Sequence, residues 1–234
     1  MKKLLAFLAA IMILITLVSC RKNDVSNVKG KISGDVSTTG TNEEQTEQIP
    51  EEDSKLKLGK VDSHTYESEF LNLKITLDDD WYLYTEEEIA ELNNITITSF
   101  DEEFQEKYEN ATSFYDLFAQ NLTSGETINI LFEKVNAVAA IALDENEYMD
   151  LTIDNLSHLD PNSGMAVVSC EKDMNSKLGD RIVPSLKMVM DFSGINLYER
   201  CFIFKKGAYF AGLTIVSVSE ESLDNIISCF SSEN

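Results

Sequence analysis

The last third of the chain constrains the fold most, because its strand-like segments are joined by very short turns. Ser193-Gly194 and Lys206-Gly207 make tight turns between the last three of these segments. A connection of about two residues can join only antiparallel neighbours. The sequence therefore predicts an antiparallel meander near the C-terminus, within a set of four strands over residues 165–171, 185–192, 197–204 and 209–217.

Two further hairpins are expected before the meander. Residues 73–77 alternate apolar and polar side chains, as a half-buried strand does, and residues 66–70 can pair with them. Residues 114–120 and 128–134 flank Ser124-Gly125-Glu126, which has the composition of a hairpin turn. Both hairpins extend the predicted antiparallel sheet.

Helices are indicated by their start signals and by apolar stripes. Two capping boxes precede expected helices, Thr85 with Glu88 and Ser99 with Glu102. The expected helices cover residues 85–92, 100–109, 145–159 and 220–230. The last one presents an apolar stripe of Leu223, Ile226, Ile227 and Phe230, and such a stripe needs a sheet face to cover. The sequence thus predicts one α+β domain over residues 63–234, with a mainly antiparallel sheet flanked by helices.

The first twenty residues have the organisation of a targeting signal. Two lysines precede an apolar run from Leu4 to Val18, and polar composition begins directly after Cys20. This arrangement resembles a bacterial lipoprotein signal peptide with its lipobox. The resemblance implies that residues 1–19 are removed, that Cys20 carries diacylglycerol, and that acyl chains hold the protein on the extracytoplasmic face of the cell membrane. The alternative is an uncleaved transmembrane helix, since the run is almost long enough to span a bilayer.

Residues 20–62 are expected to be the lipidated cysteine followed by a disordered tether. They are rich in Ser, Thr, Asn, Gly, Glu and Gln, and their few apolar residues show no period. Such a segment cannot bury enough surface to offset the entropy of ordering it. A flexible coil of roughly 40 residues reaches on the order of 35 Å, so we expect the domain to stand clear of the bilayer.

Several aromatic and glycine positions of the domain follow a recognisable order. They are Tyr66-Glu67-Ser68-Glu69-Phe70-Leu71-Asn72-Leu73-Lys74-Ile75, then Trp81, and later Lys206-Gly207-Ala208-Tyr209 with Leu213-Thr214-Ile215 before the last amphipathic helix. This order resembles the PsbP-like family, especially PsbP-like lipoproteins of gut Firmicutes. The resemblance implies an α/β/α sandwich and an accessory or adaptor role without catalysis. No binding residue of the photosynthetic members carries over, because none of their positions is matched.

Charge is distributed unevenly along the chain. The 41 acidic and 19 basic residues give a formal net charge of −22. Residues 64–160 hold 23 acidic and 3 basic residues, whereas residues 21–62 and 161–234 each have a net charge of only −2. Phosphate groups are bound by basic surfaces, so we expect no nucleic-acid partner. The acidity is better interpreted as one polarised face, which repels anionic lipid.

Residue patterns that carry catalysis are missing from the sequence. His64 lies at the domain edge and His158 near a helix end, and neither has a metal ligand at suitable spacing on its own element. No phosphate-binding loop or nucleophile elbow is present. A serine or cysteine nucleophile needs a base within reach. We therefore expect no enzyme, and no cofactor besides the diacylglycerol on Cys20.

Asp78, Asp79 and Asp80 are the candidate cation-binding residues, since calcium favours several carboxylate oxygens on a flexible loop. The chain lacks the spaced Asp/Asn-x-Asp/Asn-Gly pattern that makes such a loop specific, so calcium is the less favoured interpretation. The aromatic group that follows, Trp81, Tyr82 and Tyr84, would offer a stacking platform for a sugar or peptide if exposed. We expect Trp81, at least, to be part of the core.

Three cysteines follow Cys20 in the chain, namely Cys170, Cys201 and Cys229. In an exported protein two of them can form a disulfide, and the sequence leaves the pairing open. The favoured interpretation is three buried thiols that act as small apolar side chains.

These observations favour a membrane-anchored, monomeric and non-enzymatic binding or accessory protein, whose partner is an envelope protein or other envelope component. The acidic half supports a second hypothesis, a receptor for a cation or a cationic small ligand. A third hypothesis, an unrecognised hydrolase, requires a deep pocket with a perturbed pair of carboxylates.

Overall fold

The computed structural model describes residues 55–95, 102–160 and 163–232, which form five helices and thirteen strands. The predicted signal peptide, Cys20, most of the tether and the Ser99 cap lie outside these residues. Within the described ranges, no helix is both long and apolar enough to cross a membrane.

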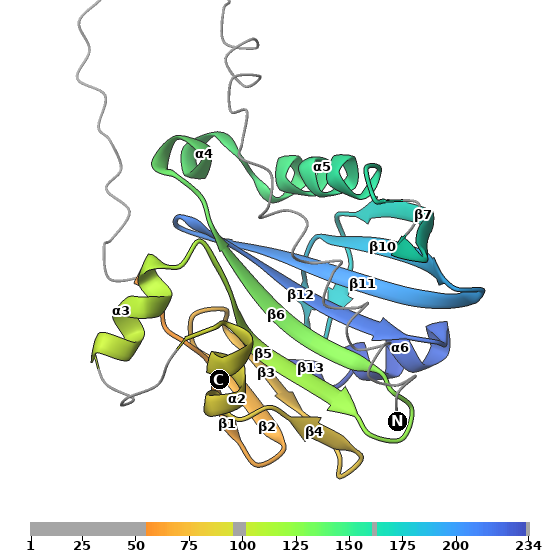
Figure 1. Ribbon diagram of the computed structural model, residues 1–234, viewed down its shortest axis with the longest axis horizontal. Helices are drawn as coiled ribbons and strands as arrows, with labels where there is room; N and C mark the ends of the chain where they lie inside the picture. Colours follow the sequence, from red (N-terminus) through yellow and green to blue (C-terminus); the bar gives the residue numbers. More distant parts are fainter. Residues whose placement is uncertain (1–54, 96–101, 161–162, 233–234) are drawn as a thin grey trace, which may run out of the picture.

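A seven-stranded antiparallel sheet forms the centre of the domain (Figure 1). Its strand order is β4-β5-β6-β12-β11-β10-β7. The strands are β4 (Trp81–Leu83), β5 (Ser113–Asn121), β6 (Thr127–Lys134), β7 (Met165–Asp173), β10 (Ser185–Phe192), β11 (Ile195–Lys206) and β12 (Tyr209–Ser217). The β5–β6 hairpin and the β10–β11–β12 meander confirm the sequence predictions.

Two smaller sheets accompany the main one. One has the order β1-β2-β3-β13, and the other pairs β8 with β9. Their strands are β1 (Lys60–Asp62), β2 (Thr65–Ser68), β3 (Leu73–Thr76), β13 (Phe230–Ser231), β8 (Lys177–Leu178) and β9 (Arg181–Ile182). The β2–β3 hairpin was predicted, whereas β13 was not. Phe230 pairs with Ile75 across β13 and β3, so it belongs to a strand rather than to the closing helix.

The helices are α2 (Glu86–Leu92), α3 (Glu102–Asn110), α4 (Ala137–Ala142), α5 (Glu145–Leu156) and α6 (Glu220–Ile227). The capping box of Thr85 and Glu88 before α2 is confirmed. Helix α6 ends at Ile227 instead of residue 230, because the chain turns at the Ser228 cap towards β13. The first turns of α2, α5 and α6 carry acidic residues, as expected where the helix dipole favours anions.

The two faces of the main sheet are covered by different layers. On one face, Ile128, Ile130 and Phe132 join a large apolar cluster that includes side chains of α6 and of the small β1-β2-β3-β13 sheet. On the other face, α5 packs over β7 and β11, reaches β12 through the contact of Tyr148 with Phe210, and contributes Tyr148, Met149 and Leu156 to a second cluster. Helices therefore lie on both sides of an antiparallel sheet (Figure 1), and the predicted α+β class is confirmed.

The folded domain begins before residue 63. Leu56 is buried in the large apolar cluster, and β1 starts at Lys60. The backbone N–H of Gly59 donates to both carboxylate oxygens of Asp116, at 3.0 and 3.1 Å. The phenolic O–H of Tyr66 donates to the same carboxylate at 2.6 Å. The two Gly59 bonds attach residues 55–62, which were expected in the tether, to strand β5.

Candidate functional site

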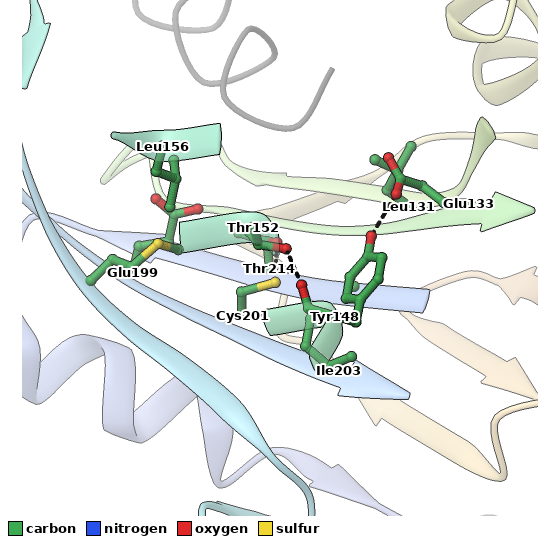
Figure 2. A pocket seen from close by; sticks show the side chains of 11 residues that line it. Leu131, Glu133, Tyr148, Thr152, Leu156, Glu199, Cys201, Ile203 and Thr214 are labelled. Atoms are coloured by element: carbon green, nitrogen blue, oxygen red, sulfur yellow. Dashed lines mark hydrogen bonds between the residues drawn. The ribbon is translucent and has the colours of Figure 1, made fainter. Parts of the chain in front are cut away.

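A narrow cavity of about 60 Å³ lies between helix α5 and the main sheet (Figure 2). Its walls combine apolar, hydroxyl, thiol and carboxyl side chains from α5 and from strands β6, β10, β11 and β12. The lining residues are Leu131, Glu133, Tyr148, Thr152, Leu156, Met188, Glu199, Cys201, Ile203, Gly212 and Thr214.

The strand register explains why polar side chains gather beneath α5. Thr214 lies directly opposite Asn129 on β6 and Cys201 on β11, and directly opposed residues share a face of the sheet. Side chains alternate along a strand. The β6 residues that alternate with Ile128, Ile130 and Phe132 therefore point towards α5. The polar positions of the central strands therefore face a helix instead of solvent.

Helix α5 is fastened over the cavity by contacts at its N-terminal half. Asp144 caps the helix and forms a capping box with Glu147. The Lys172 ammonium of β7 donates to Asn146 at 2.8 Å and to Asp150 at 2.7 Å. The Tyr148 ring stacks on the ring of Phe210, with 4.3 Å between centroids and 5° between planes.

Glu133 is a buried carboxylate at one end of the cavity. One of its oxygens accepts a hydrogen bond from the Tyr148 hydroxyl at 2.6 Å, whereas the other is buried without a hydrogen-bond partner. Burial raises the pKa of Glu133, and the Tyr148 hydrogen bond partly opposes that rise. An unpartnered carboxylate oxygen in such a place costs free energy unless a donor meets it.

Glu199 is a second buried carboxylate, and it lines the other end of the cavity beside Leu156 (Figure 2). Glu199 is only 4 % exposed, and its side-chain Oε2 has no hydrogen-bond partner. Burial raises the pKa of Glu199 to about 7. At neutral pH the group is therefore poised between its charged and uncharged forms.

Cys201 lies between the two glutamates, and its environment favours the protonated thiol. The Thr214 hydroxyl donates to its Sγ at 3.4 Å. Burial raises the pKa of the Cys201 thiol to about 12; the hydrogen bond from Thr214 partly opposes that rise, and the nearby charge of Glu199 adds to it. Since the thiolate is the reactive form, this protonated thiol serves as a wall of the cavity.

The two perturbed glutamates are not arranged as a hydrolase pair. Glu133 pairs with Phe210, and Phe210 pairs with Lys205, which is six positions along β11 from Glu199. With two strand spacings across and six residues along the strand, their α carbons are roughly 20 Å apart. Carboxylates that cooperate in glycoside hydrolysis are about 5–9.5 Å apart. The pair cannot act together on one bond.

The structure places the predicted cation-binding residues away from this cavity. Asp78, Asp79 and Asp80 form the exposed turn between β3 and β4. The Asp79 carboxylate pairs with the His64 ring at 3.5 Å, and the Asp80 backbone N–H donates to Asp78. Among the described residues, no group of three or more His, Cys, Asp or Glu side chains has the arrangement of a metal site.

The aromatic group next to these aspartates is divided between the two faces of the sheet. Trp81 is buried in the large apolar cluster, as expected. Tyr82 is 39 % exposed, and its ring centroid is 5.5 Å from that of Tyr84. Tyr84 in turn lies 4.9 Å from Phe118. The two tyrosines lie on the polar side of the sheet, because Tyr82 is opposite Gln120 and Gln120 is opposite Thr127.

All three cysteines of the described residues are free thiols. Cys170 and Cys201 are partly buried, and both thiols have raised pKa values because of burial. The expectation of three buried thiols is wrong for Cys229, which is exposed. Because α6 ends at Ile227, Cys229 is in the turn before β13 rather than on a buried helix face.

Comparison with known proteins gives distant structural likenesses, of which two are described below. No family model and no curated protein sequence matches the chain. A solved structure from Bacteroides thetaiotaomicron has 12 % identity and a TM-score of 0.33 over 69 % of this chain and 45 % of its own. LpqN of Mycobacterium tuberculosis, described as involved in cell envelope biogenesis, has 13 % identity and a TM-score of 0.37 over 67 % of this chain and 79 % of its own. Neither likeness carries a functional argument.

The sequence analysis did not single out Glu133 or Glu199. Each is an isolated glutamate within a strand, at a position where alternation points it away from the apolar cluster. Such a position is ordinarily solvent-exposed. The available signal was the length of the amphipathic segment 145–159, which needs a sheet face to cover.

Proposed function

We propose that the protein is a lipid-anchored, extracytoplasmic binding protein that holds a small organic cation beneath helix α5. One observation carries the proposal: a single cavity contains two buried glutamates, each with an oxygen that has no hydrogen-bond donor. A positively charged nitrogen supplies both the donors and the charge that these oxygens require.

The rest of the cavity fits binding without chemistry. The Cys201 thiol is held protonated by its raised pKa, and the two glutamates are too far apart to share a reacting bond. His64 and His158 are not among the cavity residues. The anchoring part of the proposal rests on the lipobox sequence that ends at Cys20.

A thermal melt of the purified protein tests this function. Methylammonium and spermidine salts should raise the melting temperature more than sodium chloride of matched ionic strength, because a ligand stabilises the state that binds it. Glu199→Gln should remove most of this specific rise, whereas Asp154→Asn on the exposed side of α5 should retain it. Equal responses to the organic salts and to sodium chloride would exclude the proposal.

A second candidate function is the accessory role, with a protein of the envelope as partner. It is supported by helix α4, whose six residues are all apolar and none of which is buried. Val138 is 68 % exposed and Ile141 is 88 % exposed, and exposed apolar groups of this kind mark contact surfaces. A partner recovered from membranes with the protein, and lost when Val138 and Ile141 are both changed to serine, would support this role. Recovery that is unaffected by the double change would exclude α4 as the contact.

A further inference from the structure

We infer that the ligand of the α5 cavity is a linear aliphatic polyamine, with one terminal ammonium group at Glu133 and the other at Glu199. This inference rests on the proposed function and specifies its ligand. The observation behind it is the placement of the two carboxylates, which lie at opposite ends of one narrow cavity rather than side by side (Figure 2).

The distance between the two carboxylates sets the length of the ligand. The cavity follows α5 from Tyr148 to Leu156, which is about 12 Å at ~1.5 Å per residue. The roughly 20 Å between α carbons, reduced by two hydrogen bonds of about 3 Å, leaves about 14 Å as an upper limit before the reach of the two side chains is subtracted. Two ammonium nitrogens about 8–12 Å apart would therefore meet both carboxylates.

The volume and the length of the cavity together favour a chain without rings. A volume of about 60 Å³ holds on the order of four waters at ~15 Å³ each. Because this volume is spread over the roughly 12 Å between the two glutamates, an extended alkyl chain can follow it, whereas a sugar ring or an aromatic ring needs a wider space. Leu131, Ile203 and Met188 provide apolar walls for methylene groups.

The middle of the cavity offers hydrogen-bond acceptors for an internal amine. The Thr152 hydroxyl donates to the Tyr148 carbonyl at 3.0 Å, and the Thr214 hydroxyl donates to the Cys201 sulfur. Each hydroxyl oxygen keeps lone pairs that can accept from a secondary ammonium. A triamine such as spermidine matches both the terminal carboxylates and these central hydroxyls.

Isothermal titration calorimetry with a series of amines tests the inference on the unmodified protein. A fully extended chain advances ~1.2 Å per bond, so the nitrogens of diaminooctane are about 11 Å apart and those of diaminobutane about 6 Å. We expect spermidine and diaminooctane to bind at least about tenfold more tightly than diaminobutane or octylamine, since only they reach both carboxylates. Octylamine is the matched control, because it has the chain length of diaminooctane and a single ammonium group.

Variants assign the two ends of the ligand. Glu133→Gln and Glu199→Gln should each reduce the affinity for diaminooctane to that for octylamine, whereas Asp154→Asn should leave it unchanged. Equal binding of octylamine and diaminooctane would overturn the polyamine inference but retain the proposed function. A lack of binding by every amine would overturn both. The amine series needs no variant, so it decides the question even if a substituted protein fails to fold.

Discussion

The two faces of the seven-stranded sheet are built from the same strands but bury different kinds of side chain. Strand β6 contributes Phe132 to one face, where its ring is 5.2 Å from Phe114 and 5.8 Å from Phe70. The next residue, Glu133, points to the other face and keeps an oxygen without a partner. One face is closed by apolar packing, whereas the other retains a cavity with buried carboxylates. The contrast shows that alternation along the same strands builds one face of apolar packing and one face with buried, partly unpaired carboxylates.

The largest expected effect comes from the apolar face. Phe132→Ala should lower the free energy of unfolding by about 3–5 kcal/mol, because it deletes a fully buried ring between aromatic neighbours. Urea denaturation measures the change. Glu133→Gln, one residue away, is the control and should cost less than about 1 kcal/mol, since it removes a buried charge that has a single hydrogen bond. If both variants lowered the free energy of unfolding equally, the proposed difference between the two faces would be wrong.

The next largest effect concerns pH and the α5 face. Burial raises the pKa of Glu199 from its ordinary value of 4.5 to about 7, so folding favours its protonated form. Its contribution to stability is therefore fully present below pH 4.5 and is lost as the pH rises through about 7. Converted at 1.36 kcal/mol per pKa unit, the loss is roughly 3 kcal/mol.

Urea denaturation at several pH values checks this expectation by comparing the free energy of unfolding of the protein with that of Glu199→Gln. Between about pH 4.5 and pH 8, the free energy of unfolding of the variant should rise relative to that of the protein. Asp116→Asn provides a comparison on the opposite face, where the pKa of Asp116 is raised by burial to about 6. The change in free energy of unfolding of Asp116→Asn relative to the protein should level off at a lower pH than the corresponding change for Glu199→Gln. A Glu199→Gln difference that is independent of pH would contradict the assignment.

A smaller effect is expected from the cap of the covering helix. Asp144→Ala removes the side chain that accepts from the Glu147 backbone N–H at 2.8 Å, and it should cost about 1 kcal/mol. Hydrogen exchange should accelerate across α5 and leave β6 and β12 protected. Ser219→Ala, at the cap of α6 on the apolar face, is the matched variant. If it speeds exchange in α5 as well, the two covering layers are not independent.

The smallest effect on stability is expected at Cys229. Because this thiol is exposed, Cys229→Ser should change the free energy of unfolding by less than about 0.5 kcal/mol. A thiol reagent at pH 8 should modify Cys229 rapidly, whereas Cys201, with its pKa near 12, should react slowly. Mass spectrometry of the labelled peptides separates the two sites. Faster labelling of Cys201 would show that the α5 face is open.

Much of the fold was predictable because its signals are local. The Ser193-Gly194 and Lys206-Gly207 turns determine which strands of the meander are neighbours, and the Thr85–Glu88 capping box begins α2 where expected. The C-terminal end of α6 was mispredicted, because the apolar residue Phe230 continues the helical stripe yet pairs with Ile75 in a strand. That pairing depends on a partner 155 positions earlier in the chain, which no local pattern reveals.

The candidate site was not predictable in the same way. The sequence drew attention to Asp78, Asp79 and Asp80 because they are consecutive, but they form an exposed turn. Glu133 and Glu199 are 66 positions apart, and each appears alone as an ordinary polar residue of a strand. They share a cavity only because β12 lies between β6 and β11 in the sheet.

By itself, the sequence determined the α+β class, the hairpins and meander, and the uneven charge along the chain, since each follows from composition, spacing or alternation. Only the tertiary structure decided which polar residues are buried. Alternation gives a strand two faces, but it cannot tell whether the second face meets water or a helix. Here α5 covers that face, and burial beneath it raises the pKa of Glu199 and leaves two carboxylate oxygens without partners.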